Sequence, residues 1–339
     1  MVKQIHDDRK VMLTQWISDL KPNHTVLEVV SGDASSRRYF RFRDQNISYI
    51  AVDAPPASED VALFVAMTEA YAAQKLIVPT VFDFNEEQGF MCLLDLGDDL
   101  LSKHLSETNV LDFYRSSMNL LPSVRQVMKT SKGALPSYNR DMLLMEMNLM
   151  DEWFLDKLLD IQPIDSKKEM TTNIKDLLVN NALKQPQVGV HRDFHSRNLM
   201  LYQDDIAVID YQGAVCGPLT YDLVSLLRDC YVEWPQSILD ILLHEQFQIL
   251  KDEDILPDNI TEPEFIQYFD WMGIQRHMKV LGIFSRLSLR DNKHDYLKEI
   301  PRVLNYIIDV SSRYVELQSF SEWLREDILP EWRRVCVAQ

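Results

Sequence analysis

Apolar and polar positions follow two different periods along the first hundred residues. Residues 3–20 repeat apolar side chains at helical spacing and predict an amphipathic helix, and the alanine-rich residues 59–75 predict a second helix. Short runs rich in β-branched and aromatic residues predict strands. These runs are 26–30, 37–42, 48–52, 80–84 and 90–94. The pattern therefore indicates a small sheet-rich lobe that ends near residue 95.

The rest of the chain has a helical pattern that is interrupted once. Residues 97–183 are mostly helical, with one long run over 138–160, and a compact island of strands and loops follows at 188–218. The clearest later helices are predicted at 219–230, 236–250, 262–289 and 294–316. We therefore expect an α+β chain with two domains, a small β-rich lobe at 1–95 and a larger, mostly helical lobe at 96–339.

Composition limits the partners of this chain. It has 35 Lys and Arg against 52 Asp and Glu, a net charge of −17, whereas nucleic-acid binding relies on clustered cations. No apolar stretch approaches the roughly 20 residues of a membrane span, and the start, MVKQIHDDRK, lacks the apolar core of a signal peptide. We expect a cytoplasmic protein that binds neither nucleic acid nor a membrane.

The island carries a pattern of oxygen ligands suited to phosphoryl transfer. It reads HRDFHSRNLMLYQDDIAVIDYQG over 191–213, with Asn198 five residues after Asp193 and Asp210 twelve residues after Asn198, at the end of a strand. A hairpin of this kind brings the two carboxylates and the amide toward one point. Phosphoryl transfer needs a carboxylate that orients the attacking hydroxyl, and oxygen ligands that hold magnesium on the phosphates. The alternative is a hairpin in which these residues only cap turns.

The pattern H-x-D-x-x-x-x-N with a later strand-end Asp resembles the aminoglycoside-phosphotransferase and choline-kinase superfamily. The resemblance implies a protein-kinase-like two-lobed fold that uses ATP and Mg²⁺. It implies that Asp193 is the catalytic base, that Asn198 and Asp210 are the magnesium ligands, and that His191 supports the loop. An Asp that follows the metal-binding segment in this family anchors the catalytic loop, and Asp222 takes that position here.

The resemblance also places the nucleotide. The loop SGDASSRRYF lies where the family covers the phosphates, and the segment CLLDLGDDLL at 92–101 resembles its hinge. In the loop, hydroxyl groups and positive charges are the expected phosphate contacts, and in the hinge, backbone groups are expected near the adenine. The residues implied are Ser35, Ser36, Arg37 and Arg38 in the loop, and Asp95 and Leu96 in the hinge.

One feature departs from the kinase pattern. Kinases carry a lysine on the strand that follows the phosphate loop, and it pairs with the nucleotide phosphates. Here that strand reads YIAVDAPP, and Asp53 stands where the lysine is expected. Either Arg37, Arg38 or Arg41 replaces the missing charge, or the nucleotide is held differently. Without the lysine, Glu69 in the helix 59–75 is interpreted as an exposed charge rather than its partner.

Resemblance to one branch of the superfamily extends over both lobes, from about residue 25 to 310. Segments such as GDASSRRYFRF, HRDFHSRNLM and QRHMKVLGIFSRL are similar to the bacterial anomeric N-acetylmuramate and N-acetylglucosamine kinases of cell-wall recycling. The branch implies transfer from ATP to the anomeric hydroxyl of an amino sugar. That hydroxyl is acidic enough that an ordinary Asp pKa would suffice for the base.

The polar and aromatic residues that follow the catalytic loop are the candidates for the sugar pocket. They are Gln212, Arg228, Glu233, Trp234 and Arg276. Two other readings stay open. One is a kinase of the same fold for an aminoglycoside or an amino alcohol such as choline, and the other is a catalytically dead nucleotide-binding scaffold. The sequence does not determine the oligomeric state.

Overall fold

The computed structural model describes residues 2–30 and 36–338, and these form two compact units. Unit 1 consists of residues 1–100, 129–134 and 199–212, and unit 2 consists of 101–128, 135–198 and 213–339. The sequence analysis placed the domain boundary after residue 95, so it assigned residues 129–134 and 199–212 to the second domain. Within the described part of the chain, no helix combines the length and apolarity needed to cross a membrane.

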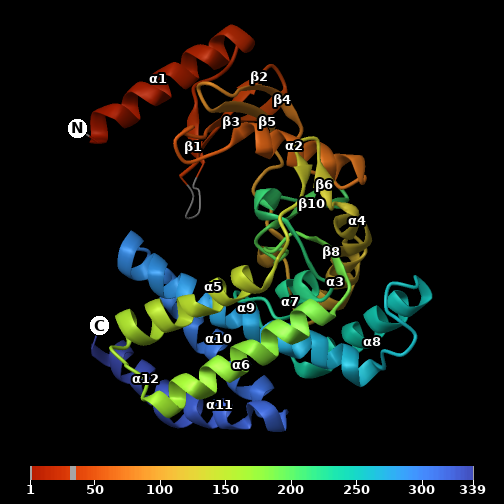
Figure 1. Ribbon diagram of the computed structural model, residues 1–339. Coiled ribbons are helices and arrows are strands. Elements are labelled where there is room, and N and C mark those ends of the chain that lie inside the picture. The colour runs from red at the N-terminus through yellow and green to blue at the C-terminus, as the bar shows by residue number, and fades with distance from the viewer. Residues whose placement is uncertain (1, 31–35, 339) are drawn as a thin grey trace. The chain divides into compact units, whose positions relative to one another are not determined.

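Unit 1 is built on a five-stranded antiparallel sheet with a helix on each face (Figure 1). The strands in spatial order are β1 (Glu28–Val30), β2 (Arg38–Asp44), β3 (Ile47–Asp53), β5 (Phe90–Leu94) and β4 (Val81–Asn85). Helix α1 (Val2–Leu20) covers one face, and α2 (Val61–Ala73) packs against the other. These seven elements confirm the helices and strands that the apolar pattern predicts for this region.

The two faces of the sheet bury alternate residues of the same strands. Phe40 and Ala51 pack toward α1 together with Leu13, whereas Tyr39 and Val52 pack toward α2. Successive side chains of a strand point to opposite faces, so a shift of one position exchanges the two environments. The face on which a charged residue of β2 or β3 lies therefore decides which helix it meets.

Two short hairpins complete unit 1. One joins β9 (Leu199–Tyr202) to β10 (Asp205–Val208), and the other joins β6 (Lys129–Thr130) to β7 (Gly133–Ala134). The first hairpin is tied to the early part of the chain by backbone hydrogen bonds, from Leu201 N to Asp99 O at 2.8 Å and from Val208 N to Ile77 O at 2.8 Å. The second hairpin lies inside a stretch that the sequence predicts as mostly helical.

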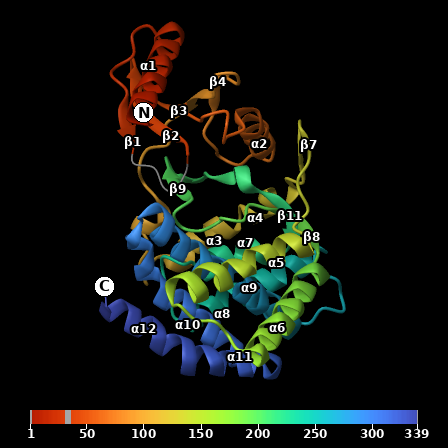
Figure 2. The ribbon, with the colours of Figure 1, turned by 60° about the vertical axis from the view of Figure 1, so that its left-hand side comes forward.

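Unit 2 is helical and is organised around α9 (Glu262–Asp291), which contacts α5, α6, α7 and α10 (Figures 1 and 2). Helix α9 begins with a capping box between Thr261 and Glu264. The other helices are α3 (Val110–Met118), α4 (Leu121–Gln126), α5 (Arg140–Leu149), α6 (Asp165–Lys184), α7 (Tyr221–Leu227), α8 (Gln236–Asp252), α10 (Ile300–Ser311), α11 (Gln318–Trp323) and α12 (Leu329–Ala338). Strands β8 (Gln187–Val190) and β11 (Val215–Pro218) pair beside them.

Two predicted helices differ in detail from the structure. The run 138–160 forms α5 and then continues as a π-helix over Met150–Leu158. The run 294–316 begins as a 3₁₀ segment, His294–Glu299, and becomes α-helical at Ile300. Pro301 explains the second change, because proline has no N–H to donate and is tolerated only in the first turn of an α-helix.

Acidification should destabilise the fold through His277 of α9. Burial, followed by the nearby charge of Arg276, lowers the pKa of His277 to about 3, against about 6.5 in an unfolded chain. Between these values the unfolded state binds a proton that the folded state does not, so stability falls as the pH falls. Because of His277, we expect the free energy of unfolding, measured with urea, to be ~2 kcal/mol lower at pH 5 than at pH 7.5. His277→Gln should remove this part of the pH dependence, and equal pH slopes in both proteins would contradict it.

Candidate active site

The loop 191–198, which follows β8, is closed by its own hydrogen bonds. The backbone N–H of His195 donates to the carbonyl oxygen of Asp193 at 2.9 Å, and that of Asn198 donates to the carbonyl oxygen of His195 at 2.9 Å. The side-chain Nδ2 of Asn198 donates to the carbonyl oxygen of Asp193 at 3.0 Å. These local hydrogen bonds fix the positions of Asp193 and Asn198 relative to each other, as the spacing of the motif predicts.

Two buried carboxylates anchor this loop to the region of α7. Asp222 accepts from the backbone N–H of His191 at 2.7 Å and from that of Arg192 at 3.0 Å. Asp229 accepts from the backbone N–H of Ser196 at 2.9 Å. The loop thus obtains partners for its backbone donors at both ends. Asp222 has the anchoring role that the resemblance implies, whereas Asp229 was not anticipated.

Arg192 connects the loop to a buried charge network. Its backbone has φ of 75°, a left-handed conformation that is costly for a residue with a side chain. Its guanidinium forms an ion pair with Glu146 of α5 and donates to the carbonyl oxygen of Gly213 at 3.1 Å. Glu146 also lies 3.1 Å from Nζ of Lys279 and accepts from the hydroxyl of Tyr138.

Sequence reasoning missed this network because its members lie far apart in the chain. Glu146, Arg192 and Lys279 belong to three elements that no short motif connects. The only local signal was a charged residue on the apolar side of a predicted helix, at Glu146 and again at Lys279. A buried charge requires a partner, so such positions are candidates for ion pairs.

The carboxyl group of Asp193 is strongly acidic in this setting. Burial by itself raises its pKa, but the positive charge of Lys279, with smaller contributions from His195, Arg276 and His191, lowers the pKa to about 2. An ordinary Asp pKa would already suffice for the base, and the surroundings of Asp193 make it more acidic still. Asp193 is therefore ionised at every pH near neutrality, ready to accept a hydrogen bond from a hydroxyl group and to hold it in place.

The predicted sugar-pocket residues of unit 2 have very different surroundings. Arg228 is 1 % exposed and forms an ion pair with Asp270 at 2.6 Å, so it is a buried structural cation rather than a surface charge. Trp234 donates from Nε1 to the hydroxyl of Tyr114 at 2.8 Å. Glu233 is exposed, with its carboxylate 3.8 Å from Nε of Arg302.

Arg276 is the candidate that the structure relates most directly to Asp193. It is 2 % exposed and donates to Sγ of Cys230 at 3.1 Å, and its charge is one of those that lower the pKa of Asp193. Its Nε is buried and has no hydrogen-bond partner among the described residues. A buried donor without a partner is costly unless a ligand or water satisfies it.

The nucleotide candidates in unit 1 are held by ion pairs. Ser35 lies outside the described residues. Ser36 donates to Glu59, and Nε of Arg37 lies 3.1 Å from the same carboxylate. Glu69, by contrast, is exposed on α2, as expected.

The hinge candidates are rigid for two different reasons. The carboxylate of Asp95 accepts from Ser48 Oγ at 2.6 Å, from the backbone N–H of Gly97 at 3.0 Å and from Nε of Arg41 at 2.7 Å. Gly97 has φ of 88°, which favours glycine at this turn. Leu96 is buried in a small apolar cluster with Met200 and neighbouring residues of unit 1.

Asp53, which stands where the sequence pattern expects the kinase lysine, is held by two arginines. It is fully buried on the α1 face of the sheet, where it accepts from Nε of Arg9 at 2.8 Å and from Nε of Arg38 at 2.8 Å. Residues 49, 51 and 53 share that face, whereas Val52 and Ala54 lie on the opposite face, against α2. Arg38, predicted to contact the nucleotide, thus serves as a structural partner of Asp53.

Asp210, the second predicted magnesium ligand, follows β10 in unit 1. It is exposed and has a left-handed backbone with φ of 66°, and its Oδ1 accepts from Nε2 of Gln212 at 2.7 Å. Among the described residues, no group of three or more His, Cys, Asp or Glu is arranged to hold a metal ion by itself. Any cation at this site would therefore take ligands of another kind, such as an amide oxygen or phosphate.

Comparison with known proteins gives consistent results. The phosphotransferase enzyme family matches residues 26–255. The chain is 38 % identical to the N-acetylmuramate/N-acetylglucosamine kinase of Neisseria meningitidis serogroup B (strain MC58), over 91 % of this chain and 93 % of that protein. Ethanolamine kinase of Plasmodium vivax has a similar structure, with a TM-score of 0.62, 12 % identity and coverage of 86 % of this chain and 85 % of that one. Aminoglycoside phosphotransferase APH(4)-Ia, in a ternary complex with ADP and hygromycin B, has a TM-score of 0.56 and 15 % identity, covering 86 % and 97 %.

Proposed function

The chain belongs to the phosphotransferase enzyme family, and from this premise we propose that it phosphorylates the anomeric hydroxyl of N-acetylmuramate and N-acetylglucosamine with ATP. The Neisseria relative matches nine-tenths of this chain, and its name supports an N-acetyl amino sugar as the acceptor. The observation that carries the proposal is the ionised Asp193 in a loop closed by hydrogen bonds, beside the cations Lys279 and Arg276. The product would be a sugar 1-phosphate of the kind that cell-wall recycling uses.

Asp193 would act mainly by positioning. A carboxylate with a pKa of about 2 is a weak base, but it accepts a strong hydrogen bond from the attacking hydroxyl. In a loose phosphoryl-transfer transition state the hydroxyl keeps its proton until late, so orientation counts for more than basicity. The proton then passes to the Asp193 carboxylate as the new O–P bond forms, and ADP leaves.

Asn198 and Asp210 are the residues that would each offer an oxygen to magnesium when a nucleotide is bound. The side-chain nitrogen of Asn198 is engaged with the backbone of its own loop, which leaves its amide oxygen as the atom available to a cation. Asp210 contributes an exposed carboxylate. Magnesium is commonly bound by one or two protein oxygens together with phosphates, and when bound it neutralises charge on the phosphoryl oxygens.

Arg276 is the candidate for recognising the acidic sugar. N-acetylmuramate differs from N-acetylglucosamine by a lactyl group that carries a carboxylate. A guanidinium that lies near Asp193 and has an unsatisfied Nε would pair with that carboxylate. Gln212, Glu233 and Trp234 stay as secondary candidates for sugar contacts, and so does Arg228, although its NH2 is engaged in the buried pair with Asp270.

The test is transfer from ATP and magnesium to a panel of acceptors, with the product position read by phosphorus NMR. The panel holds N-acetylmuramate, N-acetylglucosamine, glucose, kanamycin and choline. We expect a 1-phosphate on the two N-acetyl sugars and little product on the others. Transfer only to kanamycin or choline would assign the chain to a different acceptor, and no transfer to any acceptor would favour a scaffold without catalytic activity.

A further inference from the structure

Arg192 is the one partly buried residue among the non-glycine residues whose backbone is left-handed in the described chain. Eight such residues have positive φ, and the seven others are exposed. Six of those seven end a helix or lie in the turn of a hairpin, where the left-handed conformation is common. Arg192 does neither, and it directly precedes Asp193. Its conformation therefore has a different cause.

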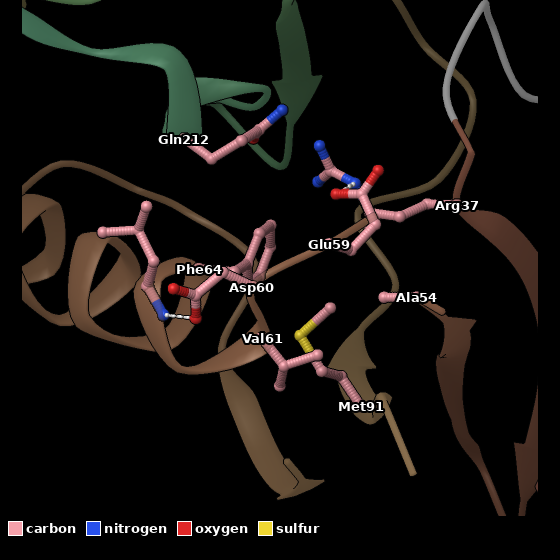
Figure 3. Close-up of a pocket in the computed structure, with 9 residues that line it drawn as sticks. Arg37, Ala54, Glu59, Asp60, Val61, Phe64, Met91 and Gln212 are labelled. Atoms are coloured by element: carbon pink, nitrogen blue, oxygen red, sulfur yellow. Dashed lines mark hydrogen bonds and ion pairs between the residues drawn. The ribbon is translucent and has the colours of Figure 1, made fainter. Parts of the chain in front are cut away.

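Asp210, the seventh exposed residue of this set, shows how a left-handed backbone is held locally. Aspartate tolerates the conformation because its short polar side chain can hydrogen-bond nearby. Its Oδ1 accepts from Nε2 of Gln212, two residues along the chain, at 2.7 Å. Gln212 also lines a cavity of about 110 Å³, and Figure 3 shows it across that cavity from the paired Arg37 and Glu59. The restraint on Asp210 is thus a local hydrogen bond at the surface.

Arg192, by contrast, is held at its backbone and at its side chain by residues that are distant in the sequence. Asp222 of α7 accepts from its backbone N–H at 3.0 Å, and the hydroxyl of Ser225 donates to its carbonyl oxygen at 3.4 Å. Its guanidinium pairs with Glu146 of α5 and donates to the carbonyl oxygen of Gly213 at 3.1 Å. These partners offset the cost of a left-handed backbone at a residue with a long side chain.

Glu146 has a second cation as well as Arg192. It is 3 % exposed, its carboxylate lies 3.1 Å from Nζ of Lys279, and it accepts from the hydroxyl of Tyr138. If Arg192 were replaced by a neutral residue, Lys279 would still neutralise the carboxylate. Arg192 can therefore be substituted without leaving a buried charge unpaired, which is the change that usually unfolds such a network.

We propose that the ion pair between Glu146 and Arg192 positions Asp193 by holding Arg192 in the left-handed conformation. The inference rests on the proposed function, because it assumes that Asp193 orients the acceptor hydroxyl. The φ and ψ of one residue set the direction of the next, so an extended or right-handed Arg192 would turn the Asp193 carboxylate out of place. A displacement of about 1 Å can lower a rate about 100-fold. Arg192 and Glu146 are thus positioning residues that act through Asp193.

The test compares alanine with glycine at position 192, because glycine adopts the left-handed backbone without the steric cost that alanine pays. Both substitutions remove the guanidinium and its pair with Glu146. We expect Arg192→Ala to lower the turnover of N-acetylglucosamine roughly 10- to 100-fold. Arg192→Gly should recover most of that loss, to within about 5-fold of wild type, since the backbone N–H groups of 191 and 192 can still donate to Asp222.

Two further variants and two further measurements separate positioning from folding. Arg192→Lys keeps a charge beside Glu146 and should lie between Arg192→Ala and wild type. MgATP affinity, measured by calorimetry, should change by less than about 3-fold in all variants at this position, because Arg192 acts on the acceptor side through Asp193. Hydrogen exchange of the peptide that contains amides 191 and 192 should be roughly 10-fold faster in Arg192→Ala than in Arg192→Gly.

The matched control uses an exposed left-handed residue. Gln203 has φ of 56° in the turn of the β9–β10 hairpin, and its replacement by alanine or by glycine should leave turnover at the wild-type level. Equal losses of turnover in Arg192→Ala and Arg192→Gly would overturn the inference, because the charge of Arg192 and not its backbone would then matter. Full turnover in Arg192→Ala would overturn it as well.

The hydrogen-exchange comparison separates the inference from the proposed function. A wild-type protein that phosphorylates none of the acceptors would remove the proposed function and, with it, the role of Asp193. The exchange rates would still decide whether the ion pair holds the backbone, since they need no acceptor. Equal exchange in the alanine and glycine variants would show that Arg192 keeps its conformation without the pair, and would contradict the inference in an active protein too.

Discussion

Asp193→Asn should lower turnover by roughly 10²- to 10⁴-fold, the largest effect on activity that the structure predicts. Asparagine keeps the shape of the side chain, but its amide neither accepts the proton of the attacking hydroxyl nor carries the negative charge that orients it. MgATP affinity should change by less than about 3-fold, because in the proposed role this carboxylate would contact the acceptor and not the nucleotide. Initial rates at saturating ATP and sugar measure the first quantity, and calorimetry measures the second.

A matched substitution separates this effect from a loss of folding. Asp204→Asn changes an exposed aspartate in the turn of the β9–β10 hairpin and should leave turnover unchanged. Because the pKa of Asp193 is about 2, turnover should also show no loss from protonation of Asp193 between pH 8 and pH 5. An Asp193→Asn protein that folds normally and keeps more than about a tenth of wild-type turnover would exclude Asp193 from the role proposed here.

Glu146→Gln should have the largest effect on stability. Glu146 is 3 % exposed and neutralises two cations, Arg192 and Lys279. Glutamine is close in size but uncharged, so the two cations would be left in a region of low polarity. Breaking a buried pair in this way costs ~3 to 5 kcal/mol, which urea unfolding at pH 7.5 would measure. Because Arg192 precedes Asp193 in the loop proposed to carry the chemistry, turnover should fall as well.

The control is an ion pair of the same kind at the surface. Glu152 pairs with Lys157 at 2.5 Å, but both side chains are about half exposed, and Glu152→Gln should cost less than ~0.5 kcal/mol. Adding Lys279→Met to Glu146→Gln should recover part of the lost stability, since it removes one of the two unpaired cations. A loss below ~1 kcal/mol in Glu146→Gln would mean that water or a rearrangement satisfies the network.

The predictions that held rest on interactions between residues close in the chain. Apolar periods identified α1, α2 and the strands of unit 1, because both periods follow from local backbone geometry. The conformation of the loop 191–198 was equally accessible, since Asp193 and Asn198 are joined by hydrogen bonds within the loop itself. The five-residue spacing of Asp193 and Asn198 was therefore sufficient to predict that the two residues lie close together.

The features that the sequence did not reveal depend on which face of an element a side chain lies on. The strand YIAVD has two faces, and the sequence did not mark that Asp53 lies on the one that meets α1, where Arg9 and Arg38 bind it. The low pKa of Asp193 could not be predicted in the same way. Its largest lowering contribution comes from Lys279, which is more than eighty residues away in the sequence.

The sequence by itself thus determined the order of helices and strands in the first hundred residues, the α+β class and the loop that carries Asp193 and Asn198. Local spacing is sufficient for each of these features, because backbone hydrogen bonds and turn geometry act over a few residues. Only the tertiary structure decided that Asp53 is a buried anchor, that Arg37 pairs with Glu59, and that Glu146 joins Arg192 to Lys279. Those arrangements depend on which charges become buried together, and that is settled when the helices pack against the sheet and against each other.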